Sequence, residues 1–154
     1  VKWITPIGFP VEQNYEAMQS RQIRLSLGDG SSCKATLRIP ATNRTPDVIR
    51  QINGIAPNVI HSLDATVLLL AVVKAKKAGI RSIGVVHDSF SAHACHIGSL
   101  SKIIREAFVE VYRADVLKDL HSQFQAQTDK AIPSLPSYGS LDIEEVLQSA
   151  YFAG

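Results

Sequence analysis

Val85-Val86-His87-Asp88-Ser89-Phe90 is the stretch that decides how this sequence is interpreted. It joins two short runs, Ile80–Val86 and Phe90–Ala94, whose residues favour β-strands. The pattern predicts a tight hairpin with Asp88 in the turn. A carboxylate held there suits a metal ligand in phosphoryl or nucleotidyl transfer, because Mg²⁺ prefers hard oxygen ligands in fixed positions. Aspartate and serine are also favoured in ordinary turns, so the local pattern alone leaves both interpretations open.

The hairpin is flanked by segments with helical patterns. A short helix is predicted from Thr45-Pro46-Asp47, with the threonine as N-cap, to about Asn53-Gly54. A second helix is predicted from about Pro57 to Lys77, and its apolar centre is typical of a helix buried on all sides. Apolar residues at helical spacing predict two more helices, at Ile97–Tyr112 and about Asp115–Gln127. A last short helix is predicted at Leu141–Ser149, with acidic residues in its first turn. Together with the strands, these helices indicate an α+β fold.

A second, basic hairpin is predicted near the start of the chain. Its strands are Gln22–Leu27 and Lys34–Ile39, and Asp29-Gly30 between them is a strong hairpin signal. Its arms carry four basic residues, namely Arg21, Arg24, Lys34 and Arg38. A two-stranded ribbon fits a DNA major groove, where Arg and Lys can contact guanine edges. The alternative is a solvated surface hairpin with scattered positive charge.

The composition excludes several other classes of protein. With 154 residues and 45% hydrophobic content, the chain suits one globular unit or a piece of a larger domain. A formal charge of +2 does not indicate nucleic-acid binding by itself, so such contacts would need local patches. Cys33 and Cys95 have no CxxC spacing, which indicates a reducing intracellular compartment. The most apolar run, Ala65–Val73, is too short for a membrane span, and no signal peptide is visible. The start at Val1 without methionine suggests a fragment.

Four blocks, in order, resemble the single-subunit RNA polymerases of bacteriophages and mitochondria. Val85–Phe90 is similar to the last catalytic motif of that family, and Gly54–Asp64 to the segment that precedes it by one helix. Trp3–Val11 resembles its Thr-Pro-x-Gly-Phe-Pro-Val block, and Leu135-Pro136 with the aromatic end Tyr151–Gly154 resembles its C-terminus.

Two details bear on the branch of the family. Related DNA polymerases share the His-Asp pair but usually continue with glutamate, whereas Ser89-Phe90 follows here. After the motif, Ala92-His93-Ala94 is closer to the mitochondrial version than to the best-known phage enzymes.

The resemblance implies a fold and a reaction. Residues 1–154 would form the C-terminal part of a DNA-directed RNA polymerase, an α+β palm whose β-hairpin carries the catalytic aspartate and packs with several α-helices. Asp88 is then a catalytic residue and a ligand of Mg²⁺, one of two aspartates that hold two ions for template-directed nucleotidyl transfer. His87 is interpreted as a supporting or primer-contacting residue, or as one that only closes the turn. The second aspartate, with the family's lysine and tyrosine, is expected upstream of Val1, so the chain alone is expected to be inactive.

The resemblance also implies contacts with nucleic acid. His61 and Ser62 match the family's Asn-x-x-His-Ser block and are expected at the minor groove of the template–product pair, where correct pairs offer similar acceptors. The alternative is that His61 is a core residue or caps the helix. Residues 21–39 stand where phage enzymes carry a promoter-reading loop, with Arg24, Lys34 and Arg38 as candidate contacts. Residues 133–154 form a C-terminal extension.

Partners and location follow from the same resemblance. The expected partners are the DNA template and promoter, the RNA product, nucleoside triphosphates and the remainder of the polymerase chain, with no membrane. The expected location is the cytoplasm of a bacterial host of a phage or prophage, with the mitochondrion or plastid as the alternative.

Other functions stay open at this point. The chain could be a fragment of a related DNA polymerase, or a non-catalytic nucleic-acid-binding remnant. A zinc site would use His87, His93, Cys95 and His96, but residues along one strand point in different directions.

Overall fold

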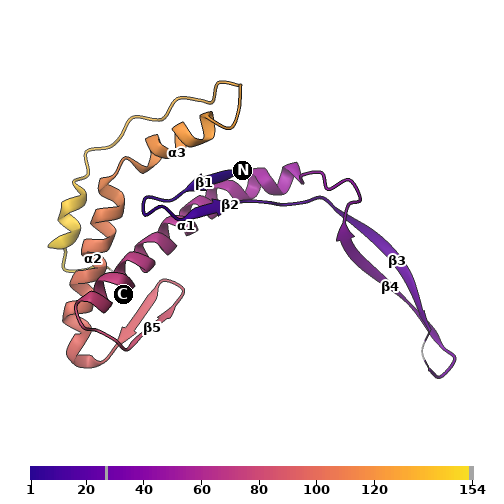
Figure 1. The fold of residues 1–154 in the computed structure, drawn as a ribbon, viewed down its shortest axis with the longest axis horizontal. Coiled ribbons are helices and arrows are strands. Elements are labelled where there is room, and N and C mark those ends of the chain that lie inside the picture. Colours follow the sequence, from indigo (N-terminus) through magenta and orange to yellow (C-terminus); the bar gives the residue numbers. More distant parts are fainter. Residues whose placement is uncertain (27, 153–154) are drawn as a thin grey trace. The chain divides into compact units, whose positions relative to one another are not determined.

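The computed structural model describes residues 1–26 and 28–152, and these residues combine helices with small antiparallel sheets (Figure 1). The chain divides into two compact units, one formed by Val1–Glu12 with Asn58–Gly154 and the other by Gln13–Pro57. This mixture is an α+β arrangement, as the sequence predicts. The elements in chain order are β1 Lys2–Ile4, β2 Pro10–Glu12, β3 Met18–Ser26, β4 Ser32–Pro40, α1 Val48–Lys77, β5 Ile83–Val86, β6 Ser89–Ala92, the 3₁₀ turn η1 Ala94–His96, α2 Ile97–Arg113, α3 Val116–Gln125 and the 3₁₀ turn η2 Ile143–Leu147.

The core of the larger unit is built from α1, α2 and the β5–β6 hairpin. Its buried members come mainly from the two helices, namely Val67, Ala71, Ala75, Ile80, Leu100, Ile103, Ala107 and Val111. Ile83, Phe90 and Ala92 of the hairpin pack against this cluster. At its edge, Lys74 Nζ and Glu110 Oε2 form an ion pair of 2.5 Å between α1 and α2.

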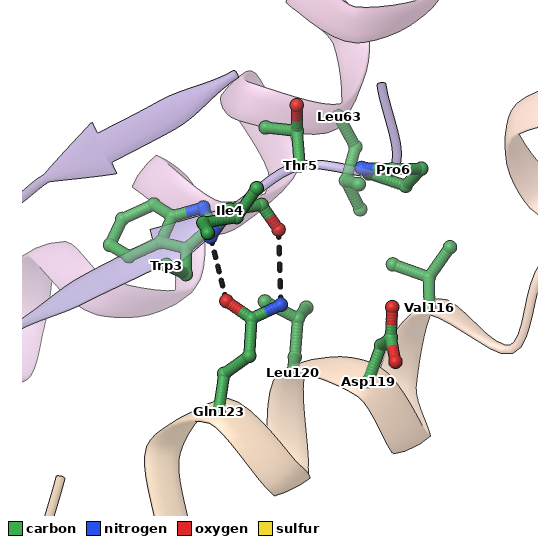
Figure 2. A pocket seen from close by; sticks show the side chains of 9 residues that line it. All are labelled: Trp3, Ile4, Thr5, Pro6, Leu63, Val116, Asp119, Leu120 and Gln123. Atoms are coloured by element: carbon green, nitrogen blue, oxygen red, sulfur yellow. Dashed lines mark hydrogen bonds between the residues drawn. The ribbon is translucent and has the colours of Figure 1, made fainter. Parts of the chain in front are cut away.

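Strand β1 is attached to α3 through side-chain amides. Gln123 accepts a hydrogen bond from Ile4 N (2.7 Å) and donates one to Ile4 O (3.1 Å), as Figure 2 shows. Gln127 repeats this arrangement with Lys2 N (3.0 Å) and Lys2 O. Residues four apart on a helix share one face, and residues two apart on a strand share one edge. The two glutamines therefore satisfy the free edge of β1 much as a neighbouring strand would.

The C-terminal segment folds back onto α2. Arg105 Nη1 donates to Val146 O and Ser149 O, each at 2.7 Å, and the guanidinium lies 5.4 Å from the centre of the Phe152 ring. Phe152 also contacts Phe108, with ring centres 5.0 Å apart. Asp142 caps η2. The predicted helix Leu141–Ser149 is thus a shorter 3₁₀ turn, and Ala153-Gly154 lie outside the described residues.

The smaller unit contains the long β3–β4 hairpin. Nine residues of each strand pair, from Met18 opposite Pro40 to Ser26 opposite Ser32. The predicted hairpin is confirmed and is longer than expected, while Leu27 lies outside the described residues. At the tip, Asp29 Oδ1 accepts hydrogen bonds from the backbone and hydroxyl of Ser31, and these bonds lower the pKa of the Asp29 carboxyl.

Helix α1 differs from the prediction in its boundaries. One helix runs from Val48 to Lys77 with Pro57 inside it, so the predicted break at Asn53–Pro57 is wrong. Pro57 removes a single backbone hydrogen bond, and the turns on both sides are long enough to continue the helix despite that cost. The predicted N-cap Thr45 is also wrong. Asp47 caps the helix, because its carboxylate accepts from Arg50 N at 3.1 Å.

Burial of α1 also differs from the prediction. Its buried residues are Leu63, Thr66, Val67, Ala71 and Ala75. Ile60 and Val73 are 57% and 49% exposed, so α1 is buried on one face only within this chain. The even distribution of apolar residues around the helix could not reveal which face packs.

Membrane insertion is not decided by the composition of α1. By length and hydropathy, α1 is the one helix among the described residues that could cross a membrane. Helix α1 extends well beyond the apolar run Ala65–Val73 on which the sequence prediction relied. A core helix of a globular protein meets the same criterion, and α1 contributes three residues to the core cluster described above.

We expect Gln123→Ala to destabilise the larger unit by about 1–3 kcal/mol, because it leaves two backbone groups of Ile4 without their partner. Trp3 is the single tryptophan and is 2% exposed beside this site, so its fluorescence during urea unfolding measures the effect. Gln22→Ala, at an exposed position of β3, is the matched control and should leave the transition unchanged. Equal midpoints for the two variants would contradict the role given to Gln123.

Candidate active site

The position of Asp88 follows from the alternation of core-facing and exposed residues along the β5–β6 hairpin. Val86 pairs with Ser89, which leaves His87-Asp88 as a two-residue turn, and Ser89 belongs to the strand, not to the turn as the sequence suggested. Ile83, Phe90 and Ala92 face the core, and the alternate residues Gly84, Val86, Ser89 and Ser91 are exposed. Because one face packs against the core and is partly buried, the register of the strands is fixed, and so is the position of the turn.

His87 has an unusual backbone conformation. Its φ is 55°, in the left-handed region that glycine or asparagine usually occupies in tight hairpin turns. Such a conformation costs roughly 1–2 kcal/mol for an ordinary L-residue. Residues kept in strained conformations are concentrated at functional sites. His87 therefore occupies a position where glycine would be less costly.

The Asp88 carboxylate is exposed and open. Within residues 1–26 and 28–152, no hydrogen bond or ion pair engages it. Over that same part of the chain, no three His, Cys, Asp or Glu residues come together as a metal-binding group. Asp88 can thus supply oxygen ligands to a hard cation, but a complete Mg²⁺ site needs further ligands. In the described part of the chain, His87, His93, Cys95 and His96 do not form such a group either, so the zinc alternative has no support.

His61 and Ser62 lie on α1 in the larger unit. His61 is exposed, whereas the Ser62 hydroxyl is occupied within the fold. Trp3 Nε1 donates to Ser62 Oγ at 2.9 Å, and Ser62 Oγ in turn donates to Val59 O at 2.7 Å. The one proton of this hydroxyl is therefore used inside the protein. The sequence patterns did not identify the link to Trp3, although a buried indole N–H usually finds an acceptor.

Asp64 lies on α1 two residues after Ser62, and its charge acts on a neighbouring helix. Burial, together with the negative charge of Asp64, raises the pKa of the Tyr112 hydroxyl. Asp64 thus acts electrostatically on α2.

The β3–β4 hairpin has two unlike faces. Residues directly opposite each other share a face, so Arg24 lies beside Lys34, and Arg38 beside Ser20. Gln22 and Thr36 form the pair between them. The other face carries Ile23, Leu25, Leu37 and Ile39, together with Arg21.

The basic face carries uncompensated charge. Like charges directly opposite each other destabilise a hairpin, and Arg24 and Lys34 are such a pair. In the described part of the chain, no carboxylate forms an ion pair with Arg24, Lys34 or Arg38. A bound anion would remove this repulsion. The three candidate residues named from the sequence thus share one face, and Arg21 does not.

Comparisons with known proteins give a consistent result. The model of a family described as DNA-dependent RNA polymerase matches residues 1–132. The chain is 39% identical over 153 residues to the chloroplastic DNA-directed RNA polymerase 3 of Nicotiana sylvestris. It is 37% identical over 156 residues to the mitochondrial DNA-directed RNA polymerase 1B of Nicotiana tabacum. It is 39% identical over 153 residues to the chloroplastic/mitochondrial DNA-directed RNA polymerase 2 of Arabidopsis thaliana.

These relatives are much longer than the chain. Each alignment covers 99% of the chain but only 14–15% of the relative. In a further relative, DNA-directed RNA polymerase 2A of Nicotiana tabacum, the share is 44%.

We expect His87→Gly to raise the free energy of unfolding by up to about 1 kcal/mol, because glycine adopts positive φ without steric strain. Urea unfolding followed by Trp3 fluorescence measures this. Ser89→Gly, one strand position further on, should instead lower stability by about 0.5–1 kcal/mol. A loss of stability in both variants would show that His87 is not strained.

Proposed function

The chain belongs to the DNA-dependent RNA polymerase family, and on that premise we propose that it works as the catalytic-hairpin part of a template-directed RNA polymerase. The observation that carries the proposal is the open Asp88 carboxylate, in a turn fixed by the packing of Phe90 and its neighbours. The chain spans about 15% of most relatives, so the remaining ligands and the nucleotide-binding residues are assigned to the rest of a longer polypeptide. The 154 residues alone are expected to be inactive.

Asp88 fits one part of a magnesium site. Its carboxylate oxygens are hard ligands on a rigid support, and its exposure leaves them accessible. When bound, Mg²⁺ would activate the 3′-hydroxyl of the RNA and neutralise charge on the departing pyrophosphate. Asp88 contributes negative charge at a fixed position. A second aspartate from the longer chain would complete the ligand set for two ions.

His87 and His61 have supporting roles in this proposal. His87 would place its imidazole beside Asp88, where it can donate a hydrogen bond to the end of the RNA. His61 would donate to the minor groove of the template–RNA pair. The minor groove of an A-form hybrid is wide and shallow, so a side chain on a helix can reach the base edges. Ser62 supports His61, since its own proton is donated to Val59 O.

The basic face of β3–β4 is proposed to contact promoter DNA. Arg24, Lys34 and Arg38 share this face with Gln22 and Thr36, which can donate and accept hydrogen bonds. Phosphate or guanine contacts would offset the repulsion between Arg24 and Lys34. The partners of the whole enzyme would be promoter and template DNA, nucleoside triphosphates and the RNA product.

The proposed location is a plastid or mitochondrion. The relatives named above are chloroplastic or mitochondrial enzymes. The expected cytoplasm of a bacterial host has no support from them, because no relative among these is a phage enzyme. The alternative of a DNA polymerase fragment is not favoured, since these relatives are all named RNA polymerases.

In the full-length polymerase, Asp88→Asn should lower RNA synthesis by at least about a hundredfold, because the amide removes a negative charge from the site of phosphoryl transfer. Primer extension on a defined template measures the rate, and a filter assay measures DNA binding, which should be retained. Asp119→Asn, on the exposed surface of α3, is the control. An Asp88→Asn enzyme with the wild-type rate would favour a non-catalytic remnant.

Replacing Arg24, Lys34 and Arg38 together by glutamine should lower initiation from a promoter by about tenfold or more. Extension of an RNA primer annealed to its template needs no promoter and should stay within about twofold of wild type. Arg21→Gln changes the opposite face of the same hairpin and should affect neither reaction strongly. Equal losses in both assays would indicate general DNA binding without promoter reading.

A further inference from the structure

Trp3 forms a hydrogen bond that crosses the larger unit. Its indole Nε1–H donates to Ser62 Oγ at 2.9 Å, over a sequence separation of 59 residues. Trp3 is 2% exposed, so this N–H has lost its access to water and depends on an acceptor within the protein. A phenylalanine would fill much of the same space without needing a partner. The polar end of the indole therefore has a purpose besides filling the core.

The Trp3 ring is itself held in place. Its strand β1 is bonded to Gln123 and Gln127 of α3, and the ring meets Phe124 edge-on with centres 6.2 Å apart. Trp3 lies in Figure 2 among residues of β1, α1 and α3, which line a small pocket. The indole is thus a rigid support from which one hydrogen bond reaches α1.

Ser62 transmits this constraint to the surface of α1. Its hydroxyl accepts from Trp3 and donates to Val59 O at 2.7 Å, so the direction of the hydrogen bond relative to the helix is fixed. Thr66 Oγ1 also donates to Ser62 O, at 2.7 Å. The next residue towards the N-terminus is His61, which is exposed.

We propose that Trp3 is a positioning residue for His61, acting through Ser62 to set the rotation of α1 about its axis. This inference rests on the proposed contact of His61 with the minor groove. A helical side chain ends about 5–6 Å from the helix axis, so a rotation of about 20° moves that end by about 2 Å. Such a shift is enough to break a hydrogen bond to a base edge.

The test uses a full-length polymerase and a template in which one adenine is replaced by 3-deazaadenine, which lacks the minor-groove N3 acceptor. The rate of adding one nucleotide is measured when this base pairs with the RNA 3′ end. Wild-type enzyme should be slowed about two- to tenfold by the modified base. His61→Ala should be insensitive to it, because the donor is gone.

Trp3→Phe should lose most of this sensitivity while keeping the fold, as monitored by circular dichroism. Ser62→Ala, which keeps the indole but removes its acceptor, should act in the same direction. Phe108→Leu, which removes ring contacts with Tyr112 and Phe152 instead of a contact with the indole, is the control. It should lower thermal stability and leave sensitivity to 3-deazaadenine at the wild-type level.

These measurements distinguish a failure of the role proposed for His61 from a failure of the role proposed for Trp3. If His61→Ala remains as sensitive as wild type, the minor-groove role of His61 is wrong and the role of Trp3 is overturned with it. If His61→Ala is insensitive but Trp3→Phe and Ser62→Ala respond like wild type, only the role of Trp3 is overturned. The double variant Trp3→Phe/His61→Ala should be as insensitive to 3-deazaadenine as His61→Ala alone. An additional effect of Trp3→Phe in that background would show that it acts by another route.

Discussion

The burial of one face of the β5–β6 hairpin is the constraint on which the proposed catalytic site depends. Ile83, Phe90 and Ala92 pack against the cluster formed by α1 and α2. Alternate residues of a strand point to opposite sides, so a shift of one residue would expose these side chains and bury the polar ones. Complete burial of a phenylalanine ring contributes roughly 1.5–3 kcal/mol, and the partly buried Phe90 ring contributes a share of this that favours one register. The turn is then fixed, and Asp88 with it.

The β3–β4 hairpin follows a different principle. Its strands are long and mostly exposed, and its register is held by nine backbone pairs instead of by a core. Because successive residues of each strand point to opposite sides, the hairpin has a basic polar face and an apolar face. Two cations directly opposite each other weaken an isolated hairpin, so this arrangement makes physical sense where an anion binds. The β5–β6 hairpin is stabilised by packing, whereas the β3–β4 hairpin presents a basic face for which DNA binding is proposed.

Side-chain hydrogen bonds connect parts of the larger unit that are far apart in the sequence. Gln123 and Gln127 attach β1 to α3, and Trp3 on β1 bonds to Ser62 on α1. Arg105 binds the carbonyl groups at the end of η2 and lies against Phe152. Each of these side chains satisfies polar groups that would otherwise lose hydrogen bonds, so the beginning and the end of the chain are both held on the helices that support the hairpin.

The sequence by itself determined the local features of this protein: the two hairpins, α2 and α3, the Asp88 turn and the family resemblance. These depend on residue periodicity, turn residues and short motifs, all of which can be recognised in the sequence alone. It failed at α1, where Gly54 and Pro57 suggested a break and Thr45 a cap, because local propensities are outweighed by the length of the continuing helix. Only the tertiary structure decided which face of α1 is buried, that Arg24, Lys34 and Arg38 share a face, and that the Trp3 indole finds Ser62. These facts depend on which residues distant in sequence come into contact, and an apolar or polar residue type does not specify its partner.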